Sequence, residues 1–296
     1  MSPSTHDPAP GDSPAAPTVA TLLKQAAATT GIAPLDAQVL LAALMRRSRA
    51  QLLAFDDTPV DPLTTAMFQA GLERRAAGEP LAYITGVREF WSLPLVVSPD
   101  VLVPRPETEL LVERCLALLG ADPDPRPRRV ADLGTGSLAI AAALARERPH
   151  WRIIATDRSP DALAIAAINR QRLNLPNIDL REGRWCAALA SEELFDAILS
   201  NPPYVAPGDP ALAALQSEPQ TALVAADHGY ADLLTIAAQA RHHLLPGGAL
   251  LLEHGATQAA RVAAELVRLG YADVVCRRDL AGLDRITEAT WNPSPP

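Results

Sequence analysis

From residue 107 onward, two kinds of segment alternate along the chain. Short apolar runs rich in valine, isoleucine, leucine and alanine, typical of buried strands, are separated by longer segments whose apolar residues recur at helical spacing. Strands are expected at 129–133, 151–156, 178–181, 196–200, 249–253 and 272–277, and helices at 107–119, 139–146, 162–173, 231–243 and 256–269. This alternation predicts a parallel, doubly wound sheet, whose ligands bind at the carboxyl ends of the strands.

A glycine-rich loop follows the first of these strands, in the run ADLGTGSLAIAA. Read as G-x-G-x-x-A, with Gly134, Gly136 and Ala139 in the key positions, it fits a dinucleotide-binding turn. Read as D-x-G-x-G-x-G from Asp132, it fits an S-adenosylmethionine loop in which Leu138 replaces the third glycine. Either ligand would be held by backbone groups at a helix N-terminus. The loop alone therefore leaves both cofactors open.

The second strand, RIIATD, ends at Asp157, 21 residues beyond Gly136. A carboxylate at this position can accept hydrogen bonds from both hydroxyls of a ribose, which nicotinamide dinucleotides and S-adenosylmethionine both carry. An aspartate after a strand is also a common N-cap of the next helix. Here Ser159, Pro160 and Asp161 can begin that helix, which favours the ribose interpretation of Asp157.

The strand DAILS runs directly into Asn201-Pro202-Pro203-Tyr204, and this tetrapeptide separates the two cofactors. An amide or base amine is a poor nucleophile because its lone pair is delocalised, so methylation needs two acceptors fixed around the N–H₂ group. The Asn201 side-chain oxygen and the Pro202 carbonyl can be these acceptors. The two prolines stiffen the loop, and Tyr204 supplies an aromatic wall. A dehydrogenase has no use for this arrangement, whose alternative is an ordinary Asn-Pro turn.

The residues before 107 form a different region. Residues 1–17 are rich in proline, serine, aspartate and alanine, and a disordered tail is expected because they can bury little apolar surface. Residues 18–80 are expected to form a small helical domain, in which Asp61 is the N-cap of a helix that begins at Pro62. The apolar positions that recur at helical spacing are Val19, Leu22, Leu23, Ala26, Leu35, Val39, Leu40, Leu44, Leu63, Met67 and Leu72.

A short β-type region, residues 81–106, joins the helical domain to the rest of the chain. Two runs, Arg88–Trp91 and Leu95–Val97, are separated by Ser92-Leu93-Pro94. Short β-type runs around a turn signal predict a β-hairpin. The hairpin would act as the linker between the two domains.

The charge and composition exclude several classes of protein. The formal net charge is -8 and the pI is about 5.3, which gives no bulk electrostatic footprint for nucleic acid or an anionic membrane. The N-terminus has neither the basic start nor the apolar run of a signal peptide, and no segment approaches the ~20 apolar residues of a bilayer span. Histidines and cysteines lack metal-ligand spacing. A cytoplasmic protein is expected, with no metal and no direct binding to membrane or nucleic acid.

These segments together resemble the HemK/PrmC family, the protein-(glutamine-N5) methyltransferases that modify the glutamine of the Gly-Gly-Gln motif in class 1 peptide chain release factors. The resemblance covers nearly everything after the tail. It rests on GEPLAYITGVREFWSLPLVVSPDVLVPRPETE, the glycine loop, NPPY, EPQTALVAADHG, PGGALLLEHG and RDLAGLDR. NPPY alone is shared with adenine-N6 DNA methyltransferases and some guanine-N2 ribosomal RNA methyltransferases, whereas PRPETE before the glycine loop is more restrictive.

The resemblance implies a fold and a cofactor. Residues 107–292 would form a seven-stranded, Rossmann-like, class I methyltransferase sheet that uses S-adenosylmethionine. The helical domain at 18–80, which precedes the hairpin linker at 81–106, would help to recognise the release factor.

The resemblance also implies site residues. Trp185 would lie against the adenine, unless it is simply a core aromatic, and NPPY would hold the glutamine. The implied cofactor-binding residues are Gly134, Thr135, Gly136, Ser137, Leu138, Asp157, Trp185 and Asn201, and the implied catalytic and substrate-binding residues are Asn201, Pro202, Pro203 and Tyr204. The chain departs from the family pattern at Leu138, where a third glycine is usual, and at Arg184, where an acidic residue is common. The segment 105–109 either frames the substrate pocket or is only a helix start with acidic residues.

The favoured interpretation is methyl transfer to a release-factor glutamine. A nucleic-acid amino methyltransferase could use the same NPPY clamp, although the acidic charge and PRPETE argue against it. A non-catalytic protein that binds release factor or ribosome is a third interpretation, if Leu138 closes the cofactor site. A dehydrogenase of the Tyr-Lys type has no candidate, because the single lysine, Lys24, lies in the helical domain.

Overall fold

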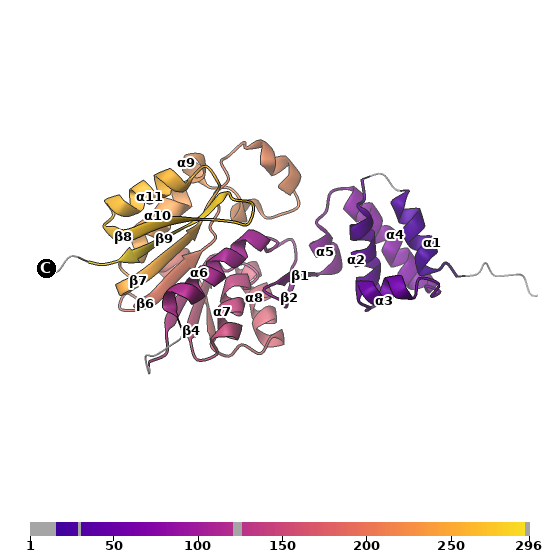
Figure 1. Cartoon of the computed structure of the whole chain (residues 1–296), viewed down its shortest axis with the longest axis horizontal. Coiled ribbons are helices and arrows are strands. Elements are labelled where there is room, and N and C mark those ends of the chain that lie inside the picture. The colour runs from indigo at the N-terminus through magenta and orange to yellow at the C-terminus, as the bar shows by residue number, and fades with distance from the viewer. Residues whose placement is uncertain (1–15, 29–30, 121–125, 294–296) are drawn as a thin grey trace, which may run out of the picture. The chain divides into compact units, whose positions relative to one another are not determined.

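The structure is a computed structural model that describes residues 16–28, 31–120 and 126–293. Apart from its last two residues, the expected tail at 1–17 lies outside the described residues. The chain divides into two compact units, Met1–Thr85 and Gly86–Pro296 (Figure 1). Both strands of the expected hairpin belong to the second unit.

The described part of the first unit is helical. Its helices are α1 (Val19–Ala27), α2 (Pro34–Leu44), α3 (Arg49–Ala54), α4 (Pro62–Ala76) and α5 (Leu81–Thr85). The side chains of Thr18, Ser48 and Asp61 accept backbone N–H bonds at the starts of α1, α3 and α4, which satisfies donors that a helix leaves free. Asp61 therefore caps α4, as its position before Pro62 predicts.

The core of the first unit differs in part from the one expected. The expected positions Leu35, Leu63 and Met67 are exposed. On α4 the expected Leu72 is buried, together with Phe68 and Gly71. A β-carbon at Gly71 would lie 2.7 Å from Leu40 Cδ2, so the missing side chain lets α2 approach this face closely. Leu63, at the start of the same helix, is 70% exposed.

The hairpin consists of β1 (Val87–Phe90) and β2 (Leu93–Val96), paired antiparallel with Phe90 opposite Leu93. Only Trp91 and Ser92 form the turn, and both have positive φ, 52° and 58°. Positive φ at both central residues is the geometry of a two-residue turn that matches strand twist. The turn is thus shorter than the expected Ser92-Leu93-Pro94, because the last two of these residues belong to β2.

The seven strands of the main sheet lie in the order β5-β4-β3-β6-β7-β9-β8. They are β3 (Arg129–Leu133), β4 (Arg152–Asp157), β5 (Ile178–Glu182), β6 (Phe195–Ser200), β7 (Leu244–Glu253), β8 (Tyr271–Arg278) and β9 (Asp284–Trp291). The first five in this order pair in parallel, whereas β9 is antiparallel to β7 and β8. The sheet is therefore mixed, not parallel throughout as expected. β9 follows β8 after a short turn and no helix, so the helix–strand alternation gave no sign of it.

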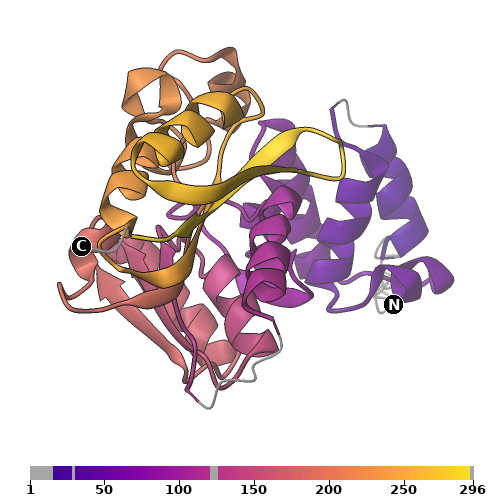
Figure 2. The same cartoon turned by 60° about the vertical axis from the view of Figure 1, so that its left-hand side comes forward.

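Helices cover both faces of this sheet (Figures 1 and 2). The helices α6 (Glu109–Leu119), α7 (Ala139–Glu147) and α8 (Pro160–Arg172) pack on one face, and α10 (Ala231–Ala240) and α11 (Ala259–Arg268) on the other. The shorter helical elements are η1 (Pro106–Thr108), η2 (Trp185–Ala188), η3 (Pro210–Leu215), η4 (Gln220–Ala222) and α9 (Ala226–Gly229). Side chains alternate along a strand, so neighbouring residues pack into the cores on opposite faces of the sheet. Val130 and Ala131 are an example.

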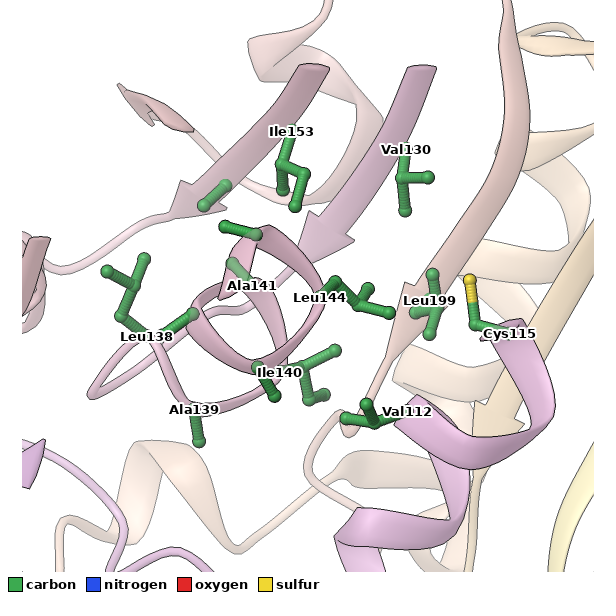
Figure 3. Packing of buried hydrophobic residues seen from close by; sticks show 14 of the residues in the cluster. Val112, Cys115, Val130, Leu138, Ala139, Ile140, Ala141, Leu144, Ile153 and Leu199 are labelled. Atoms are coloured by element: carbon green, nitrogen blue, oxygen red, sulfur yellow. The ribbon is translucent and has the colours of Figure 1, made fainter. Parts of the chain in front are cut away.

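Figure 3 shows the core around α7, whose seven residues from 139 to 145 are all buried. Five of these seven residues are alanines. Small side chains on every face let the helix lie close to the strands on one side and to α6 on the other. The start of α7, and with it the glycine loop, is held rigidly against the sheet.

Asn169 on α8 ties the hairpin to the glycine loop. It is fully buried, and its amide exchanges two hydrogen bonds with the backbone of Val96 in β2, at 2.7 and 2.9 Å. The same amide group donates to the Ser137 carbonyl at 2.9 Å. One side chain therefore satisfies three backbone groups from two segments.

Replacing Asn169 with alanine should destabilise the second unit. The change leaves those three backbone groups without their partner, which typically costs about 2–4 kcal/mol of the free energy of unfolding. Urea denaturation followed by tryptophan fluorescence measures it, since all four tryptophans lie in this unit. Gln171→Ala, on the exposed face of the same helix, is the control and should change the free energy of unfolding by less than about 0.5 kcal/mol. Equal effects of the two changes would contradict this role of Asn169.

Candidate active site

A cleft lies at the carboxyl ends of β3, β4, β5 and β6. The site residues expected from the sequence that line it are Gly134, Thr135, Gly136, Ser137, Asp157, Trp185, Asn201 and Pro203. Leu138, Pro202 and Tyr204 are not among the lining residues. Segments 100–108 and 219–222 complete the wall.

The glycine loop is fixed by the strand next to it and by a tryptophan. The backbone N–H groups of Gly134 and Thr135 both donate to the Thr156 carbonyl of β4, at 2.8 Å. Gly134 has φ +75°, and a β-carbon there would lie 2.9 Å from Cζ3 of Trp185. Both the backbone conformation and the contact with the ring therefore require glycine. At Gly136 a β-carbon would meet nothing within 4 Å, so this part of the loop faces open space.

Asp132, near the end of β3, holds the glycine loop in place through hydrogen bonds. Its Oδ2 accepts a hydrogen bond from the Thr135 hydroxyl at 2.6 Å and from the Ala141 N–H at 3.2 Å. Complete burial raises the pKa of Asp132 to about 7, although these two hydrogen bonds oppose the shift. Asp132 matched the motif in the sequence, but its bracing role could not be seen there because it depends on how the loop turns back over the strand.

Leu138 lies in the hydrophobic core, not in the cleft. Its side chain has no exposed surface and belongs to the cluster that surrounds α7 (Figure 3). Its backbone is left-handed, with φ +77° and ψ +14°. A left-handed residue other than glycine costs roughly 1–2 kcal/mol. The backbone conformation thus accounts for a glycine at this position, and the buried leucine side chain offsets the cost.

Asp157 links the ends of two loops. One carboxylate oxygen accepts from the Gly136 N–H and the other from the Ser159 N–H, both at 2.9 Å. Ser159 itself caps α8, as the sequence predicts. A carboxylate oxygen can accept more than one hydrogen bond, so each keeps a lone pair for a ligand in the cleft. The binding of ribose hydroxyls by Asp157 stays a prediction.

Trp185 is both a core residue and part of the cleft wall. Only 7% of it is exposed, and it packs in the core that α10 and α11 cover. Its indole N–H donates to Asp232 on α10 at 3.2 Å, and the same carboxylate oxygen accepts from Arg184 at 2.8 Å. The Arg184 side chain itself is 57% exposed. The arginine that departs from the family pattern is thus an ion-pair partner of the carboxylate that orients Trp185.

The NPPY residues divide between the cleft and the layer behind it. Asn201 lines the cleft, and its Nδ2 donates to the Thr108 hydroxyl oxygen at 3.0 Å. Tyr204 does not line the cleft, and its hydroxyl donates to Glu253 at 3.2 Å. Burial raises the pKa of Tyr204. Tyr204 therefore ties the NPPY loop to the end of β7. Its expected contact with the substrate remains a prediction.

The backbone of the NPPY loop is held from the opposite side. The Tyr204 carbonyl accepts a hydrogen bond from the Gln258 side chain at 3.1 Å, and a β-carbon at Gly229 would lie 2.2 Å from this carbonyl. Gly229 has φ +90°, so both the conformation and the contact exclude a side chain. Gln258 also accepts from the Gly255 N–H at 2.8 Å, and so it connects the segments after β6 and β7.

The segment 105–109 is more than a helix start. Arg105 forms an ion pair with the buried Glu218, which also accepts a hydrogen bond from the Val103 N–H at 3.0 Å. Glu109 accepts from the Trp91 N–H of the hairpin turn at 2.7 Å, and Thr108 reaches Asn201. This segment therefore joins the hairpin, the cleft wall and NPPY, which favours the first of its two sequence interpretations.

A buried carboxylate lies behind NPPY. Glu253, the last residue of β7, is 1% exposed, and burial raises its pKa to about 7. The Thr108 hydroxyl, Arg285 and Tyr204 oppose this shift, whereas the charge of Glu107 adds to it. Sequence reasoning named Thr108 only as part of the segment 105–109 and did not single out Glu253. The signal for Glu253 was its place inside PGGALLLEHG, one of the segments that carry the family resemblance.

Two replacements at Leu138 distinguish a core residue from a ligand contact. Leu138→Ala should lower the free energy of unfolding by about 2–5 kcal/mol because it empties a buried site. Leu138→Gly should be about 1 kcal/mol more stable than Leu138→Ala, since glycine adopts the left-handed conformation freely. Urea denaturation gives both values. Calorimetric titration of both variants with S-adenosylmethionine should give a dissociation constant within threefold of that of the wild type, and a tenfold tighter constant for Leu138→Gly would place the leucine against the ligand.

Neither membrane spans nor metal clusters are found in the described chain. Across residues 16–28, 31–120 and 126–293, no helix is both long and apolar enough to cross a membrane. Nor do three or more histidine, cysteine, aspartate or glutamate side chains gather within these ranges in a group that could hold a metal ion.

Known structures resemble this one in fold. A methyltransferase from Pyrococcus furiosus matches with a TM-score of 0.52 at 20% sequence identity, over 76% of this chain and 98% of its own. A T. thermophilus 16S rRNA N2 methyltransferase, solved in complex with AdoMet and guanosine, matches with a TM-score of 0.51 at 19% identity, over 69% of this chain and 49% of its own. At this level of identity the likenesses concern the fold alone.

Sequence comparison is more specific. The PrmC N-terminal domain family matches residues 19–86, and the methyltransferase small domain family matches residues 106–274. The release factor glutamine methyltransferase of Escherichia coli is 48% identical over 254 residues, 85% of this chain and 90% of that protein. Those of Salmonella typhimurium and Coxiella burnetii are each 46% identical, over 87% and 86% of this chain and 92% and 91% of their own lengths. The chain therefore belongs to the release factor glutamine methyltransferase family.

Proposed function

We propose that this protein transfers a methyl group from S-adenosylmethionine to the side-chain amide nitrogen of the glutamine in the Gly-Gly-Gln motif of class 1 release factors. The observation that carries the proposal is the orientation of Asn201. Its Nδ2 donates to Thr108 Oγ1 at 3.0 Å and the residue lines the cleft, so Oδ1 would be the amide atom free to accept a hydrogen bond there. An acceptor is what the N–H₂ group of a glutamine amide requires.

The cleft has the parts that the cofactor needs. Asp157 offers carboxylate lone pairs for the ribose, Trp185 a ring face for the adenine, and the open backbone around Gly136 at the start of α7 a place for the methionine carboxylate. When bound, S-adenosylmethionine supplies an electrophilic methyl group on a sulfonium centre. Leu138 leaves this region free, because its side chain is in the core.

The residues of NPPY would orient the glutamine amide. Asn201 Oδ1 and the Pro202 carbonyl accept its two N–H bonds, so that the nitrogen lone pair points toward the glycine loop across the cleft. The nitrogen gains a methyl carbon and loses one proton. That proton becomes acidic only as the new bond forms, so Asn201, a carbonyl or water can take it without a general base.

The partner is a release factor, as the names of the relatives state for those proteins. Recognition would involve the helical unit at 18–80, which a separate family description matches over residues 19–86. Nucleic acid is not expected to be a substrate, given the net charge of -8. The expected place of action is the cytoplasm, where release factors work.

Replacing Asn201 with alanine should lower the rate of glutamine methylation by about 10²–10³, because a lost acceptor at a transition-state contact typically has that effect. The measurement is mass spectrometry of a release factor incubated with enzyme and cofactor, which follows the mass of one methyl group on the Gly-Gly-Gln peptide. Gln171→Ala, exposed on α8, is the control and should keep the wild-type rate.

Three outcomes would count against the proposal. Unchanged methylation by Asn201→Ala would remove the amide clamp. Methylation of DNA or ribosomal RNA, but not of release factor, would favour the nucleic-acid amino methyltransferase. No calorimetric heat with millimolar S-adenosylmethionine would favour a non-catalytic binding protein.

A further inference from the structure

We infer that Glu253 is a positioning residue for the methyl transfer: it fixes the Thr108 hydroxyl as an acceptor for Asn201, and thereby keeps Asn201 Oδ1 turned toward the substrate amide. This inference rests on the proposed function, and it adds to NPPY two residues from other parts of the chain. Thr108 comes from η1 and Glu253 from the end of β7.

Two hydrogen-bonded pairs of side chains lie at this place, and Thr108 is also the largest influence that lowers the pKa of Glu253. Asn201 Nδ2 donates to Thr108 Oγ1 at 3.0 Å, and the Tyr204 hydroxyl donates to Glu253 Oε1 at 3.2 Å. Thr108 is 4% exposed and Glu253 1%. Water therefore has little access to these two side chains, and their polar groups depend on protein partners.

The direction of each hydrogen bond follows from the number of protons available. A hydroxyl has one proton, so a Thr108 oxygen that accepts from Asn201 must direct its own O–H elsewhere. Glu253 Oε2 is buried without a hydrogen bond of ordinary length in the described part of the chain, and the Thr108 hydroxyl is the strongest interaction favouring the charged carboxylate. The Thr108 proton is therefore assigned to Glu253.

The orientation matters because an asparagine amide has two nearly identical ends. If Thr108 donated to Asn201 instead, the amide would turn over and present its N–H₂ group to the cleft. A donor would then meet the N–H₂ group of the substrate, and the lone pair could not be aligned. A carboxylate that cannot donate excludes this arrangement, since it keeps the Thr108 proton on its own side.

Charged groups around Glu253 shift its pKa in opposite directions. Arg285 on β9 favours its ionised form, and Glu107 on η1 disfavours it. Arg285 is itself held by two bonds to Asp279 in the turn between β8 and β9, at 3.1 and 3.2 Å. The neighbouring His254 is directed elsewhere, to Thr287 and the Gly255 carbonyl.

The central test compares Glu253→Gln with the wild type in steady-state methylation of a release factor. The kcat should fall at least tenfold, because a glutamine side chain can donate and no longer fixes the Thr108 proton. The KM for release factor and the calorimetric dissociation constant for S-adenosylmethionine should stay within threefold. Glu192→Gln, the same replacement at an exposed position, is the matched control and should keep the wild-type kcat.

Variants at Thr108 test whether Glu253 acts through it. Thr108→Val removes the hydroxyl with little change of shape and should lower kcat as much as Glu253→Gln, while Thr108→Ser should recover most of the activity. The double variant Glu253→Gln with Thr108→Val should have a kcat no lower than that of the less active single variant, because the effects of coupled residues are not additive. Thr108→Val also keeps the inference testable if Glu253→Gln fails to fold.

A pH profile supplies a readout that a purely structural role would not move. The pKa of Glu253 is raised to about 7, so its proton returns as the pH falls below that value. The wild-type kcat should therefore decrease at acid pH, with a limiting slope of about tenfold for each pH unit. Glu253→Gln should show no such acid limb, whereas Glu192→Gln should keep it.

The outcomes separate the two proposals. A wild-type enzyme that methylates release factor, together with a Glu253→Gln variant that keeps its kcat and its acid limb, would overturn the role of Glu253 alone. Additive losses in the double variant would overturn the action through Thr108. A wild-type enzyme that binds S-adenosylmethionine and leaves release factor unmodified would overturn the proposed function, and the role of Glu253 with it.

Discussion

The pairing of β3 with β6 in the centre of the sheet brings the two halves of the site together. Leu133 lies opposite Ser200, and the Ser200 hydroxyl donates to the Leu133 carbonyl at 2.6 Å. The glycine loop begins one residue after the first of these strands, and NPPY one residue after the second. Since both strands end at the same edge, a loop suited to a cofactor and a loop suited to an amide face one cleft, although 65 residues of sequence separate Gly136 from Asn201.

Two buried carboxylates hold these two loops in place. Asp132 lies under the glycine loop and Glu253 behind NPPY, and burial raises the pKa of each to about 7. A charge is costly to bury, so each carboxylate is offset by hydroxyl or N–H donors that it also orients. The cleft is therefore held by hydrogen bonds on both sides, at the glycine loop and at NPPY.

Sequence reasoning predicted what depends on local pattern. It located β3 to β8, the hairpin, the Asp61 and Ser159 caps, and the cleft residues Asp157, Trp185 and Asn201. It missed β9, which follows β8 after a turn and not after a helix. On α4 it placed Leu72 correctly but missed Phe68 and Gly71, because the contact between Gly71 and Leu40 joins two helices. Glu253 was not singled out for the same reason: its contact with Tyr204 joins segments that meet only in space, and no spacing along the chain records that.

The left-handed backbone at Leu138 bears on how members of this family are identified. Leucine replaces the third glycine of the loop motif without entering the ligand site, because the position is governed by the handedness of one residue at the start of α7. Any chain that can offset that conformational cost with burial can replace this glycine and keep its cleft. Counting glycines in the loop would thus misjudge such a chain, whereas Gly134, against the Trp185 ring, is an example of a glycine that both its backbone conformation and its neighbour require.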